Sequence, residues 1–434
     1  MLAEESKSFL ETLLAGSACR RSPWLSSLSS AALERAKRRA LPSTRDESWR
    51  FTDLTPLYRS TVRPPASAGS VDLGPFLAGT AIDGVAARLV FIDGFFSEAH
   101  SDLPAGGGLT VARLAEAAEE KRSLVEPLLG SLADDGDDLF AAVNTAWLCD
   151  GVVVHARRQT VLREPIHCVF VTTQGAVVVH PRVLVLAEGG SELLVIEDYA
   201  ATHGGVYWVN AVCEIFVRDN ARVRHVRLQR DSGMAFHLGT TAVSVGRNGF
   251  YSSNAVSLGA RISRHNLNIR QDGPGATLEL DGLAMIGGRQ HADTHSFVDH
   301  AFPDGSSRQL HKCVVSGGAH SVFNGRILVR PGSQRTDSAQ QSRNLLMSAR
   351  ARVDTKPQLE IFADDVKCAH GATVGQLEED EVFYLRSRGM TEELARGLLS
   401  YGFAAEVVNR IPVSSVVAGL RQAIIDHTGA SGIG

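Results

Sequence analysis

Several common signatures are missing from this chain of 434 residues. Its six cysteines form no CxxC pair, so we predict neither a disulfide framework nor a structural zinc site, and reduced thiols in a cytosol-like compartment fit better. A P-loop is absent, and so is a GxGxxG turn between a strand and a helix, which argues against ATP or NAD binding by the usual backbone cradles. The GxSxG elbow of serine hydrolases is absent as well.

Charge and hydrophobicity are those of an ordinary globular protein. The formal net charge of -4, with 44% hydrophobic and 21% charged residues, gives no electrostatic reason to expect nucleic acid or an anionic membrane as a partner. No apolar run approaches the ~20 residues that a membrane helix needs. The N-terminus carries Glu4 and Glu5 and lacks the apolar region of a secretory signal. We therefore expect a cytoplasmic protein, or a protein of the plastid stroma if a transit peptide has been removed.

The middle of the chain has a sequence pattern typical of β-strands, and both ends have a pattern typical of helices. Short strand-like runs separated by Gly, Asp and Asn, with no long helices for βαβ crossovers, indicate a sandwich, a large barrel or a β-helix. No fixed repeat period is visible, so the pattern does not choose among these three folds. The predicted organisation is an N-terminal helical region at 1–60, a linker and mixed region at 61–139, a β core at 140–375 and a C-terminal helical domain at 376–434.

The C-terminal helices carry local start signals. Thr391 is a plausible N-cap, and Glu392 and Glu393 place two acids in the first turn, where the helix dipole favours them. Pro412 breaks this helix and begins another, which we expect to end near His427.

Cys368 and His370 form the first candidate site. In a strand, side chains two residues apart share a face, so a thiol and an imidazole lie on one face with Cα atoms roughly 7 Å apart. This pair suits a shared soft metal or adjacent positions on a cluster. A stable site needs about four ligands, so the others must come from elsewhere in the chain or from another subunit. A buried cysteine beside a hydrogen-bonded histidine explains the same pattern.

A histidine-rich stretch is the second candidate. The spacing of His291 and His295 is that of a helical zinc motif, but the glutamate of a metalloprotease is missing. In a strand these two positions lie roughly 13 Å apart, so polar residues on β turns are the preferred explanation and a transient metal site is the alternative. The histidines of this stretch are His291, His295, His300, His311 and His320.

Long motifs resemble the SufB/SufD family of iron–sulfur cluster assembly proteins. Asp354–Gly375, followed by Phe383–Gly389, looks like the C-terminal signature of this family. The segment HADTHSFVDH and the N-terminal motif Asp46–Thr52 also fit. Within the family the chain resembles the SufD type, because it reads HGATVG from His370 where the SufB type tends to read HEATTSK, and because it lacks clustered N-terminal cysteines.

The resemblance implies a fold, partners and a site. It implies a right-handed parallel β-helix core flanked by helical domains, a heterodimer with SufB through the β-helices, and docking of the SufC ATPase on the C-terminal helices. It also implies that Cys368 and His370 hold a transient iron–sulfur cluster shared with SufB, with none permanently bound to the isolated chain. The chain would then be a non-catalytic scaffold, and ATP hydrolysis would belong to SufC.

Three alternatives stay open at the level of the sequence. A β-helix carbohydrate-active enzyme would need convergent carboxylates, and the chain is rich in them, as Asp293, Asp299, Asp337 and Glu360 illustrate. A stand-alone metalloprotein would use the histidine-rich stretch. An isolated SufD-like chain could also form a homodimer.

Overall fold

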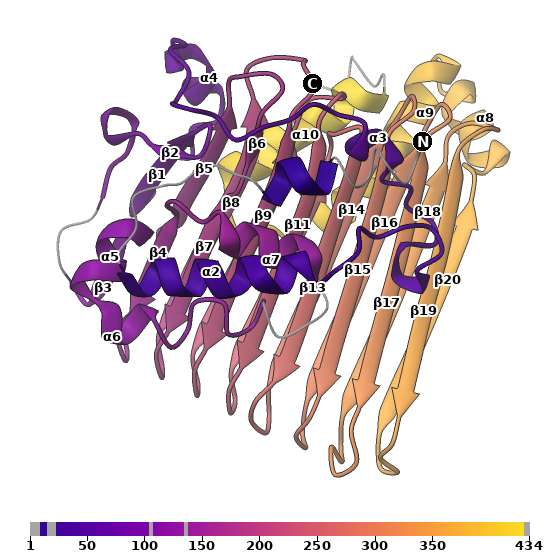
Figure 1. The fold of residues 1–434 in the computed structure, drawn as a ribbon. Coiled ribbons are helices and arrows are strands. Elements are labelled where there is room, and N and C mark those ends of the chain that lie inside the picture. The colour runs from indigo at the N-terminus through magenta and orange to yellow at the C-terminus, as the bar shows by residue number, and fades with distance from the viewer. Residues whose placement is uncertain (1–8, 15–22, 104–106, 134–137, 429–434) are drawn as a thin grey trace.

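The computed structural model describes residues 9–14, 23–103, 107–133 and 138–428. Its centre is formed by two long sheets that face each other (Figure 1). The first sheet contains, in spatial order, β2 (Phe95–Phe96), β1 (Ala87–Ile92), β5 (Ile166–Thr172), β8 (Glu192–Ala201), β10 (Arg222–Arg230), β12 (Phe250–Ser257), β14 (Thr277–Ile286), β16 (Ser306–Val315), β18 (Asp337–Leu346) and β20 (Lys367–Gly375). The second contains β19 (Arg352–Ile361), β17 (His320–Val329), β15 (His291–His300), β13 (Ile262–Gln271), β11 (Phe236–Val245), β9 (Trp208–Val217), β7 (Arg182–Ala187), β4 (Val152–Ala156) and β3 (Leu109–Arg113), and β6 (Val178–Val179) pairs with β9.

Strands that follow one another from β8 to β20 alternate between the two sheets, and neighbours within each sheet run parallel. Each coil of the chain therefore adds one strand to each sheet, which makes the core a parallel β-helix and confirms the predicted fold class. Equivalent positions on successive coils lie 26 residues apart from Phe236 to Ile262 but 32 apart from His320 to Arg352. The turns vary in length, and this is why the sequence has no fixed period.

Apolar side chains and buried polar groups share the lumen between the sheets, and helices cover both outer faces. On the second sheet, α2 (Pro23–Lys37) and α7 (Leu139–Ala146) lie in front of the strands, while the C-terminal helices lie behind the first sheet (Figure 1). Val407 and Leu420 of the C-terminal helices pack against Ile196 and Val226 of the first sheet. The remaining helices are α3 (Thr55–Tyr58), α4 (Gly74–Gly79), α5 (Leu114–Glu120), α6 (Arg122–Val125), α8 (Glu379–Ser387), α9 (Glu392–Val408) and α10 (Ser414–Thr428), with 3-10 turns at Glu47–Trp49 and Glu98–His100.

The C-terminal helices begin and end where the sequence predicts. The Thr391 hydroxyl accepts the N–H of Leu394 and caps α9, and α10 follows Pro412 and ends at Thr428. In the segment 61–139, β1, β2 and β3 belong to the two sheets, α4 precedes these strands in the chain, and α5 and α6 follow them. Within the described residues, no helix is both long enough and apolar enough to cross a bilayer.

The expectation of reduced thiols was wrong at one position. Among the residues that the structure describes, the free cysteines are Cys168, Cys213, Cys313 and Cys368. Cys149 is disulfide-bonded. A single bridge does not require a CxxC motif, so the absence of that motif did not exclude one.

Candidate functional site

Cys368 and His370 lie on β20, the last strand of the first sheet. In the register with β18, Cys368 is opposite Ser338 and His370 is opposite Gln340. Ser338 and Gln340 are both buried, and Cys368 packs against the lumen core, so this face of the strand points into the β-helix. The thiol and the imidazole therefore share the lumen face of the terminal coil, as the period of two predicts.

The two candidate ligands differ in their surroundings. His370 is exposed, whereas Cys368 is partly buried. Burial raises the pKa of the Cys368 thiol above its ordinary value; a hydrogen bond with the Ser338 backbone opposes this shift, and the charge of Asp337 adds to it. Because the thiolate is the form that binds metals, the isolated chain keeps this cysteine in its weaker protonated form.

The terminal coil leaves the β-helix open. Strands β19 and β20 are the last members of their sheets, so within the described residues each has an edge with no neighbouring strand. Phe362 is 62% exposed and Val374 is 47% exposed at this end. Both polar atoms of the buried Gln340 side chain lack a hydrogen-bond partner. Unpaired edges and exposed apolar groups are features of a surface that can bind another β structure, whereas the Gln340 atoms are buried inside the lumen.

The histidine-rich stretch does not form one site. His291 and His320 are neighbours on β15 and β17, with ring centroids 4.8 Å apart, and they lie on the outer face of the second sheet. His311 lies inside the lumen instead, stacked on Phe323 with ring centroids 4.3 Å apart. His300 is buried and bonds to Gln271 and Ser307. These histidines lie on strands, not on the β turns that the sequence suggested.

Carboxylates and hydroxyls occupy the ring nitrogens of the outer histidines. His291 contacts the Thr52 hydroxyl at 2.8 Å, His295 pairs with Asp293 at 3.0 Å, and His320 pairs with Asp354 at 2.7 Å. Burial lowers the pKa of His291 to about 4. The group is a hydrogen-bonded structural network.

Two motifs that are far apart in the sequence meet at this network. Thr52 donates to Asp293 at 2.6 Å, and Arg264 donates to the Ser48 carbonyl at 2.7 Å while its guanidinium lies 3.7 Å from the centroid of a Trp49 ring. The N-terminal motif Asp46–Thr52 is therefore fixed to the HADTH segment on the outer face of the second sheet. These contacts hold the N-terminal region on the β-helix.

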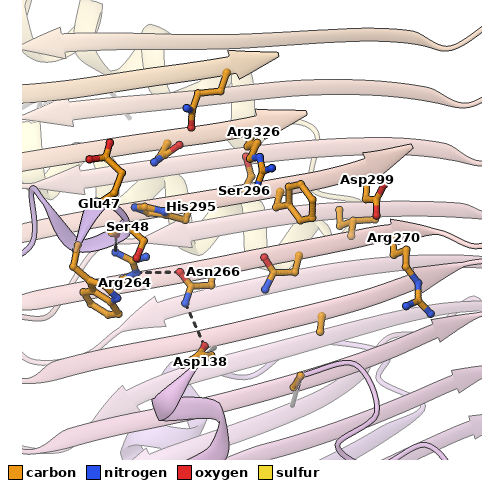
Figure 2. Close-up of a pocket in the computed structure, with 18 of the residues that line it drawn as sticks. Glu47, Ser48, Asp138, Arg264, Asn266, Arg270, His295, Ser296, Asp299 and Arg326 are labelled. Atoms are coloured by element: carbon orange, nitrogen blue, oxygen red, sulfur yellow. Dashed lines mark hydrogen bonds between the residues drawn. The ribbon is translucent and has the colours of Figure 1, made fainter. Parts of the chain in front are cut away.

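A cleft of about 960 Å³ lies beside these contacts, over β13, β15, β17 and β19 (Figure 2). Figure 2 shows Arg264 between Ser48 and Asn266, and Asn266 bonded to Asp138. Two acids of the cleft are ion-paired: Asp299 pairs with Arg330 at 2.7 Å, and Glu47 pairs with Lys356. Asp46 and Asp138 also line the cleft and accept hydrogen bonds. A glycoside-cleaving site needs a carboxylic acid that can donate a proton, and these ion-paired carboxylates do not supply one.

The sequence did not reveal a third cluster, which lies inside the lumen. Glu197, Cys213 and His225 offer ligand atoms that all lie within 4.8 Å of one another, and this is the one such group of three among the described residues. The residues come from three successive strands, so no local motif connects them. Only the register between coils could have identified them.

The C-terminal module presents an exposed aromatic pair. On α8, Phe383 is 71% exposed and Tyr384 is 56% exposed, next to an acidic first turn. The following helix is anchored: Lys312 of β16 forms an ion pair with Glu406 of α9 and donates to the Phe403 carbonyl at 2.9 Å. One end of the module thus carries exposed aromatic rings, and the other is fixed to the β-helix.

Comparison with known proteins agrees with this architecture. Residues 170–403 match the family model described as SUF system FeS cluster assembly, SufBD core domain, and residues 18–168 match the SufBD protein N-terminal region. An iron–sulfur cluster assembly SufBD family protein of Synechocystis sp. is 41% identical over 89% of this chain and 88% of its own length. Protein ABCI7, chloroplastic, of Arabidopsis thaliana is 34% identical over 86% of this chain and 79% of its own. The iron–sulfur cluster assembly protein SufD of Escherichia coli is 32% identical over 92% and 90%. The chain therefore belongs to the SufBD family of iron–sulfur cluster assembly proteins, in which it is SufD-like.

Proposed function

We propose that this chain is the SufD-like scaffold subunit of a SufBCD complex, where it helps to assemble nascent iron–sulfur clusters at its interface with SufB. One observation carries the proposal: the open terminal coil places Cys368 and His370 at the mouth of the lumen, beside unpaired strand edges. A second β-helix that pairs with these edges would cover the exposed Phe362 and Val374 and bring its own ligands to the same mouth.

The chemistry of the pair supports a shared, temporary site. Thiolate and neutral imidazole both bind iron, but two ligands are too few to hold a cluster permanently. The partner would supply the remaining ligands. Iron held by the partner, or a positive charge on the partner, would also lower the raised pKa of Cys368. Metal binding then releases the thiol proton. The cluster is the cargo of such a scaffold, and incomplete ligation allows it to be passed on.

The C-terminal module supports coupling to an ATPase. The chain has no P-loop, so nucleotide hydrolysis would belong to SufC, and this chain would act as a non-catalytic subunit. Phe383 and Tyr384 supply an exposed aromatic anchor of the kind that is common at protein interfaces. Because α9 is fixed to β16, a pull on the C-terminal helices by dimerising SufC subunits would reach the β-helix and open the SufB interface.

The cluster site is tested by the His370→Ala variant, co-expressed with SufB and SufC. We expect an intact complex with a strongly reduced cluster absorbance and iron content. The matched control is Thr373→Ala on the same strand, which removes a side chain from the opposite face. An undiminished cluster yield from the His370→Ala complex would refute the assigned role.

The docking surface is tested by a Phe383→Ser and Tyr384→Ser double variant. Both side chains are exposed, so the fold should survive while co-purification of SufC is lost. The control is Met234→Ser, another exposed apolar side chain (46%) on a turn of the β-helix. Retained SufC binding by the double variant would contradict the assignment, and removal of all residues after 376 extends the same test to the whole module.

The same open end allows a homodimer when the chain is alone. Light scattering with and without SufB tests this: we expect SufB to replace a second copy of the chain. Persistence of the homodimer in the presence of SufB would argue against a shared interface. A bacterial cytoplasm or a plastid stroma would suit the proposed function, and one relative is named as chloroplastic.

A further inference from the structure

A mixed set of metal-binding side chains meets in the middle of the lumen, far from the terminal coil. Glu197 lies on β8 and His225 on β10 of the first sheet, and Cys213 faces them from β9 of the second sheet. Their ligand atoms lie within 4.8 Å of one another, and none of the three side chains is more than 2% exposed. The cluster therefore joins the two sheets across the core.

A second thiol adjoins the cluster. Cys168 of β5 is in direct register with Glu197, on the same lumen face, and is fully buried. Burial is the main reason why the pKa of Cys168 and of Cys213 is raised, and the Glu197 charge raises both further. The charge of Glu197 thus acts on both thiols. Together, Cys168, Cys213, His225 and Glu197 offer two sulfur ligands, one nitrogen ligand and one carboxylate ligand.

Neighbouring side chains already orient these ligands. The His225 Nδ1 atom is 3.0 Å from the Tyr251 hydroxyl, and its Nε2 atom is 2.6 Å from a Glu197 oxygen. Tyr199 donates to the other oxygen of Glu197. A hydrogen bond on one ring nitrogen that directs the other toward a metal is the usual arrangement around a histidine ligand.

The charge balance favours a dication with two thiolates. Arg227 is buried beside Glu197 and Cys213, and its Nη1 atom has no hydrogen-bond partner. With protonated thiols, Glu197 and Arg227 cancel each other. With a dication, two thiolates and Glu197, the site carries one negative charge, which Arg227 again cancels. The buried Asp231 also acts on Arg227. A dication that replaces two thiol protons leaves the net charge of all these groups together unchanged, so the low-dielectric core can accept the exchange.

We propose that the lumen holds one structural zinc-class ion bound by Glu197, Cys213, His225 and Cys168. The ion replaces the two thiol protons, which leave to solvent during folding, and no oxidant or reductant is needed. A tetrahedral zinc site places its ligand atoms roughly 3.3–3.8 Å apart. The more widely spaced atoms of the group of three therefore need to approach by up to about 1 Å, and the Cys168 sulfur, which lies outside that group, has to move toward them as well. The His225 Nε2 atom and the Glu197 oxygen, now 2.6 Å apart, need to separate as the ion replaces their hydrogen bond. The ion cross-links the two sheets and is independent of the cluster site at the terminal coil.

Metal analysis of the full-length chain tests this site. The chain is refolded with one equivalent of zinc sulfate, dialysed, and measured by plasma mass spectrometry. We expect about one zinc per chain. Because the ligands are buried, a chromogenic chelator should detect the ion only after denaturation.

Two variants locate the ion. Cys213→Ser should lower the zinc content about tenfold or more, whereas Cys313→Ser, which alters a buried thiol on β16, should retain it. If Cys213→Ser fails to fold, refolding the unaltered chain with cadmium provides a second readout, an ultraviolet thiolate-to-metal absorption band. The proposal would be overturned by a refolded chain without zinc or by the absence of the cadmium band. It would also be overturned if zinc were lost in a His291→Ala variant but kept in Cys213→Ser.

Discussion

Replacing Glu214 with alanine tests what holds the N-terminal helices on the β-helix. Glu214 lies on the outer face of β9, is fully buried, and forms an ion pair with the equally buried Arg182. Its carboxylate also accepts backbone N–H groups of Gly130 at 2.8 Å, Leu132 at 2.9 Å and Ala133 at 3.1 Å. One side chain thus joins the loop after α6 to the second sheet.

The expected loss follows from what remains after the substitution. Removing one partner of a buried ion pair costs about 3–5 kcal/mol, because the other charge stays buried. Each buried N–H that loses its acceptor adds about 1–3 kcal/mol, reduced where water enters. The total stability of a folded protein is about 5–15 kcal/mol, so Glu214→Ala should release the segment from α5 to α7.

Urea unfolding and amide hydrogen exchange measure this effect. We expect a loss of at least about 3 kcal/mol, with faster exchange at Gly130, Leu132 and Ala133. The matched control is Glu360→Ala, which breaks a pair with Arg326 whose side chains are 37% and 45% exposed and which should cost about 0–1 kcal/mol.

A rescue variant separates the lost charge from the lost packing. The double variant Arg182→Met and Glu214→Leu removes both charges and should regain part of the loss, because no ion is left buried. If Glu214→Ala costs no more than Glu360→Ala, the reasoning about the buried pair is refuted.

Three further predictions concern other parts of the molecule. Burial lowers the pKa of His311 to about 3, so the folded state favours the neutral ring. The contribution of this histidine to the free energy of unfolding is complete above about pH 6.5, the pKa of an unfolded histidine, and is lost as the pH falls toward the pKa of the folded state. His311→Gln should flatten the fall in urea midpoint between pH 7 and pH 4.5, and an unchanged slope would contradict this. Trp49→Ala removes the stacking on Arg264 and should cost about 3–5 kcal/mol, seen as faster proteolysis around residues 23–60; equal cleavage rates would exclude an anchoring role. Thr391→Ala removes the cap of α9 and should cost about 1 kcal/mol in thermal unfolding, whereas Thr391→Ser should retain most of it.

Features written in neighbouring residues were determined by the sequence itself. The N-cap at Thr391 and the break at Pro412 predicted α9 and α10. Capping acts within one helical turn, and so do the fixed φ angle and missing N–H of proline. The shared face of Cys368 and His370 followed from the strand period alone. Long family motifs added the choice of a β-helix over a sandwich or a barrel, which the strand pattern could not make.

Tertiary structure decided which distant residues meet. Coils of 26 to 32 residues stack through turns of unequal length, so the sequence period could not place His311 in the lumen and His291 on the outer face. The meeting of Glu197 with Cys213 across the lumen depends on the same stacking. Alternation along a strand is a local property of the backbone, whereas the register between coils is set by the packing of the whole core. This register positions both the lumen cluster and the open end of the β-helix.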